Sequence, residues 1–324
     1  MGIRVAINGF GRIGRTVLRA LYESSRNEDI QLVAINDLAS IEESSERLKK
    51  DISLGRGNTA VEIKGDTLLV AGDVIQYTSQ ANPVKLLWKT HDIDVVLECT
   101  GQFTQAEPAH MHILAGAEKV LISALSDEKV DATIVYGVNE SALKPEHKIV
   151  SNGSCTLNCL AHLVKALDKE LGVQSGLSTS LHEYDSRQEL AIDDGSMIPT
   201  QTLSPKSIGL VLPNLEGKID GVSIRVPTFN VALLDLTFTS KERTTVEAVN
   251  AIMQKTAARL EGVVEYRDEL LVSASLKQNA ASCVFDATQT NVKQDHLVKV
   301  VAWFDNEWGF SNRLLDTAEA MMAC

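Results

Sequence analysis

The chain has little positive charge, few cysteines and no long apolar run. Its 324 residues contain 31 Lys and Arg against 43 Asp and Glu, a formal net charge of −12. This argues against nucleic acid or an anionic membrane as the main partner, because both need a basic surface. No stretch approaches the roughly 18 apolar residues of a transmembrane helix, and the N-terminus runs directly into a strand pattern without signal-peptide features. We therefore expect a globular cytoplasmic protein.

The cysteine content excludes a disulfide framework. Five cysteines in a chain of this length are typical of free thiols in a reducing compartment. Cys155 and Cys159 are four residues apart, but no second Cys/His pair lies at zinc spacing, so we predict no metal site. A chain of 324 residues is also long for a single core, which favours two domains.

The N-terminal segment has the pattern of a dinucleotide-binding unit. An apolar strand over residues 3–8 is followed by G-x-G-x-x-G, formed by Gly9, Gly11 and Gly14, and then by a helical pattern. Gly9 would allow the tight turn, Gly11 the approach of a pyrophosphate to the helix N-terminus, and Gly14 close helix–strand packing. Asp37 ends the next strand, where it can bind a ribose 2′-hydroxyl and repel a 2′-phosphate. The pattern favours NAD over NADP, with a glycine-rich turn that binds nothing as the alternative.

The rest of the first half predicts a doubly wound parallel sheet. Apolar runs over residues 94–101, 120–124 and 132–137 alternate with helical stretches, and residues 68–75 resemble a hairpin. Ligands bind at the C-terminal ends of such strands. The nicotinamide half of a dinucleotide is therefore expected near the small residues that follow two of these strands: Thr100, Gly101, Ser123 and Ala124.

The second half has a different pattern. Strand-like segments follow one another with a single helical stretch, residues 246–260, among them, which predicts an α+β domain with a mixed sheet. The expected strands are residues 176–181, 222–226, 231–239, 272–275, 282–286 and 297–304. Residues 314–322 predict a terminal amphipathic helix.

Cys155 is the candidate nucleophile. It lies between a strand pattern at 148–150 and a helix pattern from 160 to 167, where a helix N-terminus favours a thiolate. The alternative is a small buried Cys in a turn. His182 follows the strand at 176–181 and would hold the thiol ionised. Such a pair can attack an aldehyde, pass hydride to NAD and leave a thioester, which water or phosphate then releases.

Four motifs follow one another along the chain: residues 6–15 (AINGFGRIGR), 151–159 (SNGSCTLNC), 225–228 (RVPT) and 303–309 (WFDNEWG). With them the chain resembles the glyceraldehyde-3-phosphate dehydrogenase superfamily over nearly its whole length. Within the superfamily, three non-catalytic stretches look closer to erythrose-4-phosphate dehydrogenases: residues 21–25, 135–139 and 146–150. The resemblance implies an α/β Rossmann domain, residues 1–153, on which helix 312–324 packs, and an α+β catalytic domain, residues 154–311.

The resemblance also implies roles for single residues. Cys155 would be the nucleophile and His182 the base. The other implied roles are Arg12 and Ile13 beside the pyrophosphate, Asp37 beside the adenosine ribose, Asn306 on the nicotinamide carboxamide, Ser154, Thr156 and Thr202 at the incoming phosphate, and Arg225 on the substrate phosphate. A small phosphorylated aldehyde as substrate and a cytoplasmic homotetramer are implied as well.

Departures from the family pattern bear on the substrate. Asp185 stands where the family has a small or neutral residue near the substrate phosphate, and Leu203 replaces a Gly of the phosphate site. The segment between His182 and Met197 is shorter than the family pattern, and its remainder, residues 187–194, is acidic. A carboxylate facing a phosphate changes substrate preference. The resemblance of the three non-catalytic stretches favours erythrose 4-phosphate slightly over glyceraldehyde 3-phosphate, and Leu203 favours hydrolytic release.

Two alternatives stay open. One is an NAD-binding protein with degraded catalysis and a regulatory role, which the short acidic segment favours and the intact Cys155–His182 pair opposes. The other is oxidation of an aldehyde without a phosphate, which Asp185 would tolerate better.

Overall fold

The computed structural model describes residues 2–54, 59–127, 129–184 and 195–324. The chain forms two compact units, and each is described by itself. Unit 1 comprises Met1–Ile134, Glu140–Gly153 and Ser311–Cys324, and unit 2 comprises Val135–Asn139 and Ser154–Phe310. No helix within the described ranges combines the length and apolarity that crossing a bilayer requires. Asp185 and the acidic residues 187–194 lie outside the described residues.

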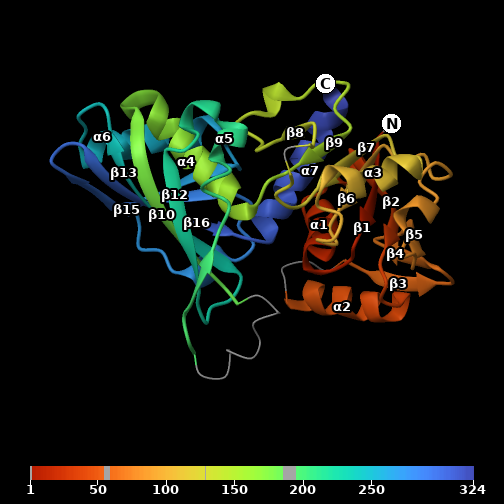
Figure 1. The fold of residues 1–324 in the computed structure, drawn as a ribbon. Coiled ribbons are helices and arrows are strands. Elements are labelled where there is room, and N and C mark those ends of the chain that lie inside the picture. The colour runs from red at the N-terminus through yellow and green to blue at the C-terminus, as the bar shows by residue number, and fades with distance from the viewer. Residues whose placement is uncertain (1, 55–58, 128, 185–194) are drawn as a thin grey trace. The chain divides into compact units, whose positions relative to one another are not determined.

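Unit 1 is built on a nine-stranded sheet with the order β3-β4-β5-β2-β1-β6-β7-β9-β8 (Figure 1). Its parallel part is β5-β2-β1-β6-β7-β9-β8, and β3 and β4 form an antiparallel edge with β5. The predicted doubly wound parallel sheet is confirmed. The strands are β1 (Ile3–Asn8), β2 (Ile30–Asn36), β3 (Val61–Lys64), β4 (Thr67–Val70), β5 (Asp73–Thr78), β6 (Val95–Glu98), β7 (Lys119–Ile122), β8 (Ala132–Thr133) and β9 (Ile149–Ser151).

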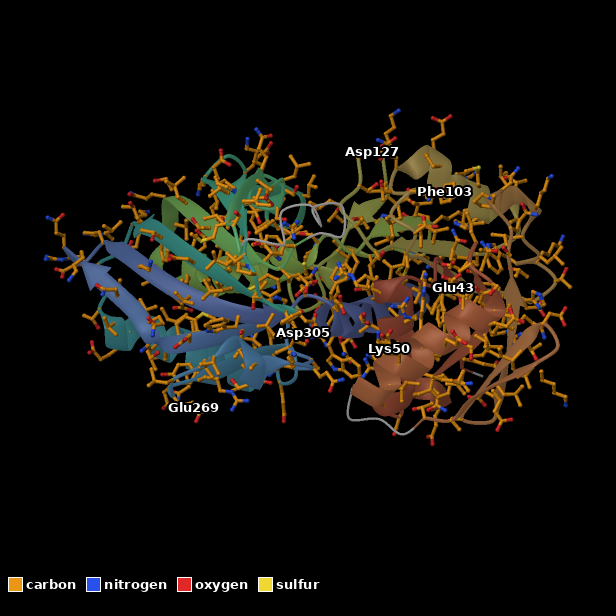
Figure 2. The ribbon with its side chains drawn as sticks, turned by 90° about the horizontal axis from the view of Figure 1, so that it is seen from below. Glu43, Lys50, Phe103, Asp127, Glu269 and Asp305 are labelled. Carbon is orange, nitrogen blue, oxygen red and sulfur yellow. The ribbon has the colours of Figure 1, made fainter. Side chains whose placement is uncertain are left out.

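The helices of unit 1 are amphipathic where they meet the sheet. They are α1 (Arg12–Glu23), α2 (Ile41–Leu54), α3 (Ala106–Leu114) and the part of α7 (Trp308–Ala323) that starts at Ser311. In α2, Ser44 and Leu48, one turn apart, are buried, whereas Glu43 and Lys50 are exposed (Figure 2). One face of this helix therefore packs inward and the other meets water.

Polar contacts attach the terminal helix to unit 1. Arg26 forms ion pairs with Asp316 at 2.7 Å and Glu319 at 2.8 Å. Thr317 Oγ1 donates to Asn152 Oδ1 at 2.7 Å, and both residues are buried. The buried Lys119 donates its ammonium to the Met321 carbonyl. These contacts hold the last residues of the chain against segments of unit 1 that come from its first half.

Unit 2 contains a seven-stranded mixed sheet with the order β11-β12-β10-β13-β16-β15-β14. Helices α4 (Cys155–Leu171) and α6 (Val246–Arg259) pack on each other and on its strands; α5 (Ile208–Val211) is short. The α+β interpretation is confirmed. The strands are β10 (Val173–His182), β11 (Ile198–Gln201), β12 (Ile219–Arg225), β13 (Val231–Ser240), β14 (Val264–Arg267), β15 (Cys283–Lys293) and β16 (Leu297–Asp305).

Two predicted strands differ from the structure. Residues 272–275 are not a strand: residues 273–276 form a 3₁₀ helix, in which Ser275 donates both its N–H and its hydroxyl to the Val272 carbonyl. The strand predicted at 132–137 stops at Thr133. Val135–Asn139 group with unit 2, where His162 and Lys165 of α4 contact the carbonyls of Tyr136 and Val138.

Candidate active site

A pocket of about 240 Å³ lies in unit 1 where β1, β2 and β6 end. Four residues predicted to bind the cofactor are among its lining residues: Gly9, Gly11, Asp37 and Thr100. Arg12, Ile13 and Gly14 are in the first turn of α1, beside it in sequence but not in its lining. Ser123 follows β7 and donates its N–H to the Glu98 carbonyl, and Asn306 belongs to unit 2. The pocket thus gathers part of the predicted set.

The three glycines of the loop differ in what surrounds them. Gly9 has φ +94°, and a Cβ there would lie 2.6 Å from the Thr100 nitrogen. At Gly14 a Cβ would lie 2.2 Å from the Gly9 carbonyl oxygen, so the helix and the turn are in direct contact. At Gly11 a Cβ would meet nothing within 4 Å. The open backbone at Gly11 is what the approach of a pyrophosphate requires.

We expect Gly14→Ala to disrupt unit 1, because the nearest atom to the new methyl group is backbone that cannot rotate away. The loss of unfolding free energy should be about 3 kcal/mol or more, measured by urea denaturation. Gly11→Ala is the matched variant, since its methyl group has space. It should leave the urea midpoint within error and weaken NAD binding about tenfold or more by obstructing the pyrophosphate. Equal destabilisation by both variants would contradict this.

Asp37 is the one charged side chain among the described residues that line the pocket. Its Oδ2 accepts from the Phe10 N–H at 2.5 Å and its Oδ1 from the Ala39 N–H at 2.8 Å. The carboxylate is therefore held in place by backbone donors and presents acceptor lone pairs. A ribose diol can donate to it, whereas a 2′-phosphate would meet a like charge. The residues present fit NAD.

Cys155 is the first residue of α4, in unit 2. Ser154 caps this helix: its Oγ accepts from the Leu157 N–H at 3.0 Å and lies 2.8 Å from the Ser204 hydroxyl. The cap leaves Cys155 at the positive end of a 17-residue helix, where developing negative charge on sulfur is stabilised.

His182 ends β10, which pairs in parallel with β12. In this pairing His182 lies directly beside Arg225 of β12. The imidazole is 7% exposed. Its Nε2 is 3.1 Å from the Thr156 hydroxyl, and its ring stands edge-on to Phe304 at 5.7 Å. Thr156 follows Cys155 directly, so the helix start and the strand end bring the predicted nucleophile and base into one neighbourhood.

The two catalytic candidates are driven towards their neutral forms. Burial raises the pKa of the Cys155 thiol to about 11, although hydrogen bonds from Thr156 and the Arg225 charge oppose the shift. Burial also lowers the pKa of His182 to about 4, and Arg225 acts in the same direction. The structure therefore does not support the expectation that pairing with His182 keeps the thiol ionised. The favoured resting state is a neutral thiol beside a neutral imidazole, which can act as a base.

The predicted phosphate-binding residues lie around this helix start. Ser204, which the sequence did not single out, connects two of them: its N–H donates to Thr202 Oγ1 at 3.3 Å and its hydroxyl meets Ser154. Arg225 donates from Nη1 to the Glu183 carbonyl at 3.0 Å, and its buried Nε has no hydrogen-bond partner among the described residues. A guanidinium with a spare buried donor is suited to an anionic ligand.

Asn306 is held by the residue before it. Asp305 is buried, and its Oδ1 accepts from the N–H groups of Glu307 and Trp308, at the start of α7. Its Oδ2 accepts from the Gln278 N–H at 2.8 Å. Burial raises the pKa of Asp305, while these backbone donors oppose the shift. The backbone on both sides of Asn306 is therefore fixed.

Comparison with known proteins gives matches along the chain. Residues 3–106 match the family model of the glyceraldehyde 3-phosphate dehydrogenase NAD-binding domain, and residues 154–306 that of the C-terminal domain. A plasmid-encoded glyceraldehyde-3-phosphate dehydrogenase of Cupriavidus necator is 48% identical over 99% of both chains. The enzyme of the same name from Xanthobacter flavus is 46% identical over 99% of both chains. That from Pseudomonas aeruginosa is also 46% identical, over 100% of this chain and 99% of the relative. The chain belongs to the glyceraldehyde-3-phosphate dehydrogenase family.

Membership of the glyceraldehyde-3-phosphate dehydrogenase family makes this chain an NAD-dependent oxidoreductase that acts on an aldehyde. NAD is its cofactor, which agrees with the acceptor-lined pocket of unit 1. Within the described residues, no group of three or more His, Cys, Asp or Glu side chains is arranged to hold a metal ion. All five cysteines are free.

Several residues of the two sites carried no signal in the sequence. Gln80, Gln102 and Phe103 line the cofactor pocket although they lie in loops of ordinary composition. Glu98, buried at the end of β6, reads in the sequence only as part of a strand. Residues of this kind become visible only when the ends of several strands meet.

Proposed function

We propose that this family member oxidises glyceraldehyde 3-phosphate through a thioester on Cys155, with inorganic phosphate as acyl acceptor. The observation that carries the proposal is the grouping of Cys155, His182 and Arg225 within unit 2, with the Thr156 hydroxyl at His182 Nε2. The relatives named above bear the name glyceraldehyde-3-phosphate dehydrogenase. Their names favour glyceraldehyde 3-phosphate over erythrose 4-phosphate as substrate. The preference for erythrose 4-phosphate rests only on non-catalytic stretches of the sequence.

The residues divide the chemistry as follows. Cys155 Sγ adds to the aldehyde carbon while its proton passes to the aldehyde oxygen, and a hemithioacetal forms. His182 Nε2 then takes the hydroxyl proton as the hydride leaves carbon, which yields the thioester. NAD supplies the hydride acceptor. A phosphate oxygen next attacks the thioester carbonyl, the acyl phosphate departs, and the proton held by His182 returns to the Cys155 sulfur.

Phosphate recognition falls to Arg225 and to the hydroxyls around Cys155. Arg225 offers its buried Nε, and the hydroxyls of Ser154, Thr202 and Ser204 lie at the N-terminus of α4. A helix N-terminus with hydroxyl donors is suited to an anion. These features support phosphate as acceptor. In the sequence, Leu203 favoured water as the acyl acceptor; its side chain is 67% exposed. With phosphate as acceptor NADH formation depends on phosphate, and with water as acceptor it does not.

The test compares three aldehydes, glyceraldehyde 3-phosphate, erythrose 4-phosphate and unphosphorylated glyceraldehyde, each with and without inorganic phosphate. We expect the triose phosphate to give the highest kcat/KM and NADH formation to depend on phosphate. Arg225→Gln should raise KM for the phosphorylated aldehydes about tenfold or more and leave that for glyceraldehyde nearly unchanged, because the guanidinium would bind the phosphate group of the substrate and not its aldehyde. Turnover that does not depend on phosphate would overturn the role of phosphate as acyl acceptor. Absence of NADH formation with all three aldehydes would overturn the proposed catalytic role.

We also propose a homotetramer in the cytoplasm, as the family resemblance implied. Leu177 on β10 and Val222 on β12 are 68% and 50% exposed, which gives the sheet of unit 2 apolar side chains for a second copy to cover. Light scattering coupled to gel filtration tests the assembly, and a monomeric mass would contradict it.

A further inference from the structure

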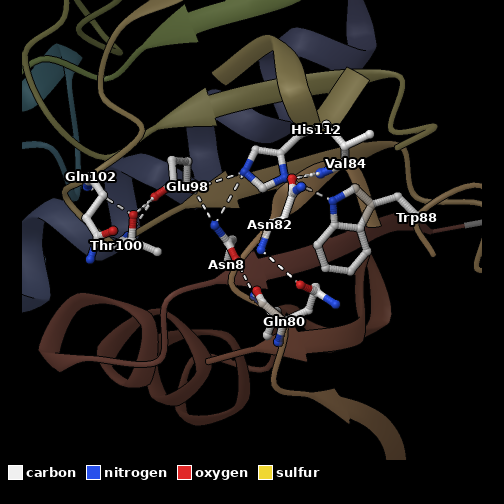
Figure 3. A network of polar contacts seen from close by, with 10 residues as sticks. Asn8, Gln80, Asn82, Val84, Trp88, Glu98, Thr100, Gln102 and His112 are labelled. Carbon is white, nitrogen blue, oxygen red and sulfur yellow. Dashed lines mark hydrogen bonds and ion pairs between the residues drawn. The ribbon is translucent and has the colours of Figure 1, made fainter. Parts of the chain in front are cut away.

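Glu98, at the end of β6, is a buried carboxylate that the reaction does not use. It is 1% exposed and accepts four hydrogen bonds (Figure 3). Its Oε2 accepts from Asn8 Nδ2 at 2.6 Å and from His112 Nε2 at 3.0 Å. Its Oε1 accepts from the Thr100 N–H at 2.7 Å and from the Thr100 hydroxyl at 2.5 Å. Four donors on two oxygens occupy the acceptor sites of a carboxylate.

Trp88 determines the tautomer of His112. The indole N–H can only donate, and it donates to His112 Nδ1 at 3.0 Å (Figure 3). Nδ1 is therefore the unprotonated nitrogen, and the single ring proton is on Nε2, where it faces Glu98. His112 is consequently a neutral donor and does not cancel the charge of Glu98. Within the described part of the chain, none of the partners of Glu98 is a Lys or Arg.

Because the carboxylate only accepts, it sets the direction of a chain of hydrogen bonds across three strands. Asn8 must point its amide nitrogen at Glu98. The Oδ1 of Asn8 therefore points the other way and accepts from Asn36 Nδ2 at 2.8 Å. Asn36 Nδ2 also donates to the Gln80 carbonyl at 3.0 Å, and its Oδ1 accepts from the Gln80 N–H at 2.9 Å. Reversing either amide would bring two donors or two acceptors together.

This chain of hydrogen bonds runs along the cofactor pocket. Asn8, Asn36, Gln80 and Thr100 are all among the residues that line it. Thr100 gives its hydroxyl proton to Glu98 and accepts from the Gln102 N–H at 3.0 Å, so the residue is held from both sides. We propose that Glu98 is a positioning residue for NAD, and that its charge orients the amides and the hydroxyl that form the pocket wall.

The proposal predicts the effect of removing the charge alone. In Glu98→Gln one carboxylate oxygen becomes an amide nitrogen. If this nitrogen faces Thr100 it meets a backbone N–H, and if it faces His112 it meets the Nε2 proton that Trp88 holds in place. Either orientation breaks the pattern. We expect the NAD Kd, measured by calorimetry, to rise about tenfold or more, and KM for NAD to rise while kcat at saturating NAD changes less than about threefold.

A charge exchange provides the rescue. In the double variant Asn8→Asp, Glu98→Gln the carboxylate moves to position 8. The new amide at position 98 keeps its oxygen for Thr100 and donates its nitrogen to the new carboxylate. That carboxylate also accepts from Asn36 Nδ2. Its second oxygen takes the place of Asn8 Nδ2, which lies 3.4 Å from His112 Nε2 in the wild type, and accepts from that nitrogen. The net charge is unchanged and the carboxylate at position 8 serves Asn36, His112 and one N–H of the new amide, whereas the second N–H of that amide stays beside the donor His112 Nε2. We therefore expect the double variant to bind NAD more tightly than Glu98→Gln but not fully like the wild type, whereas Asn8→Asp alone sets two carboxylates against each other.

The control is Glu265→Gln on β14, a half-buried carboxylate of unit 2 that accepts from Arg267 and Asn279. It should leave the NAD Kd unchanged. Wild-type NAD affinity in Glu98→Gln, or a double variant that binds no better than the single one, would overturn the proposal. If Glu98→Gln does not fold, recovery of folding and NAD binding in the double variant supports it, and failure of both overturns it. The calorimetric NAD Kd decides this test, so its outcome does not depend on which aldehyde the enzyme oxidises.

Discussion

Replacing Cys155 by serine is expected to lower aldehyde-dependent NADH formation by about 10³-fold or more. The hydroxyl of serine is a far weaker nucleophile towards an aldehyde than sulfur, and serine cannot form the thioester from which phosphate takes the acyl group. The cofactor pocket consists of residues of unit 1 alone, so NAD binding should be retained. The measurements are NADH absorbance with glyceraldehyde 3-phosphate and calorimetry with NAD.

Cys324→Ser is the matched control, because Cys324 is an exposed free thiol at the end of the chain. It should leave the rate unchanged, which separates loss of the nucleophile from a general effect of losing a thiol. If Cys155→Ser keeps more than about a tenth of wild-type activity, the thioester route is wrong. If it loses NAD binding as well, the expectation that the cofactor pocket is independent of unit 2 is wrong.

Replacing His182 by glutamine is expected to lower kcat by about 10²- to 10³-fold at pH 7, because the base for the hydroxyl proton is removed. The pH dependence should change as well. In the variant the remaining reactive form is the thiolate, and the Cys155 pKa is about 11. Its rate should therefore rise about tenfold per pH unit from about pH 7 to 10, whereas the wild-type rate depends less on pH. A variant with the same pH profile as the wild type would contradict the role of His182 as base.

The same variant should alter acid stability. Burial holds the folded-state pKa of His182 at about 4, against 6.5 for a solvated imidazole. Between these values the unfolded chain binds the proton and the folded chain does not, so wild-type stability falls as pH drops from 6.5 to 4. The loss corresponds to about 3 kcal/mol, and the His182→Gln protein lacks it. Urea midpoints at about pH 7 and 4.5 measure the difference, and identical acid losses in both proteins would contradict the assignment.

Local patterns predicted the elements that form through neighbours in sequence. The strand, glycine turn and helix of residues 3–23 are present, as is the hairpin of β4 and β5, because turn residues and apolar periodicity specify them. Residues 272–275 misled because Val-Ser-Ala-Ser alternates like a strand. In the structure Leu276 is the one buried residue of that 3₁₀ segment. The segment forms local turn hydrogen bonds and does not pair with a neighbouring strand.

The sequence by itself determined the family, the cofactor and the candidate catalytic pair, since motif spacing is preserved along the chain whatever its packing. Only the tertiary structure decided how those groups behave. It gave His182 the Thr156 hydroxyl as its partner, moved the pKa values of Cys155 and His182 towards neutral forms, and buried Glu98 among four donors beside the pocket. Desolvation and hydrogen-bond direction depend on which distant strands and helices surround a group, and that information is absent from the spacing of residues in one segment.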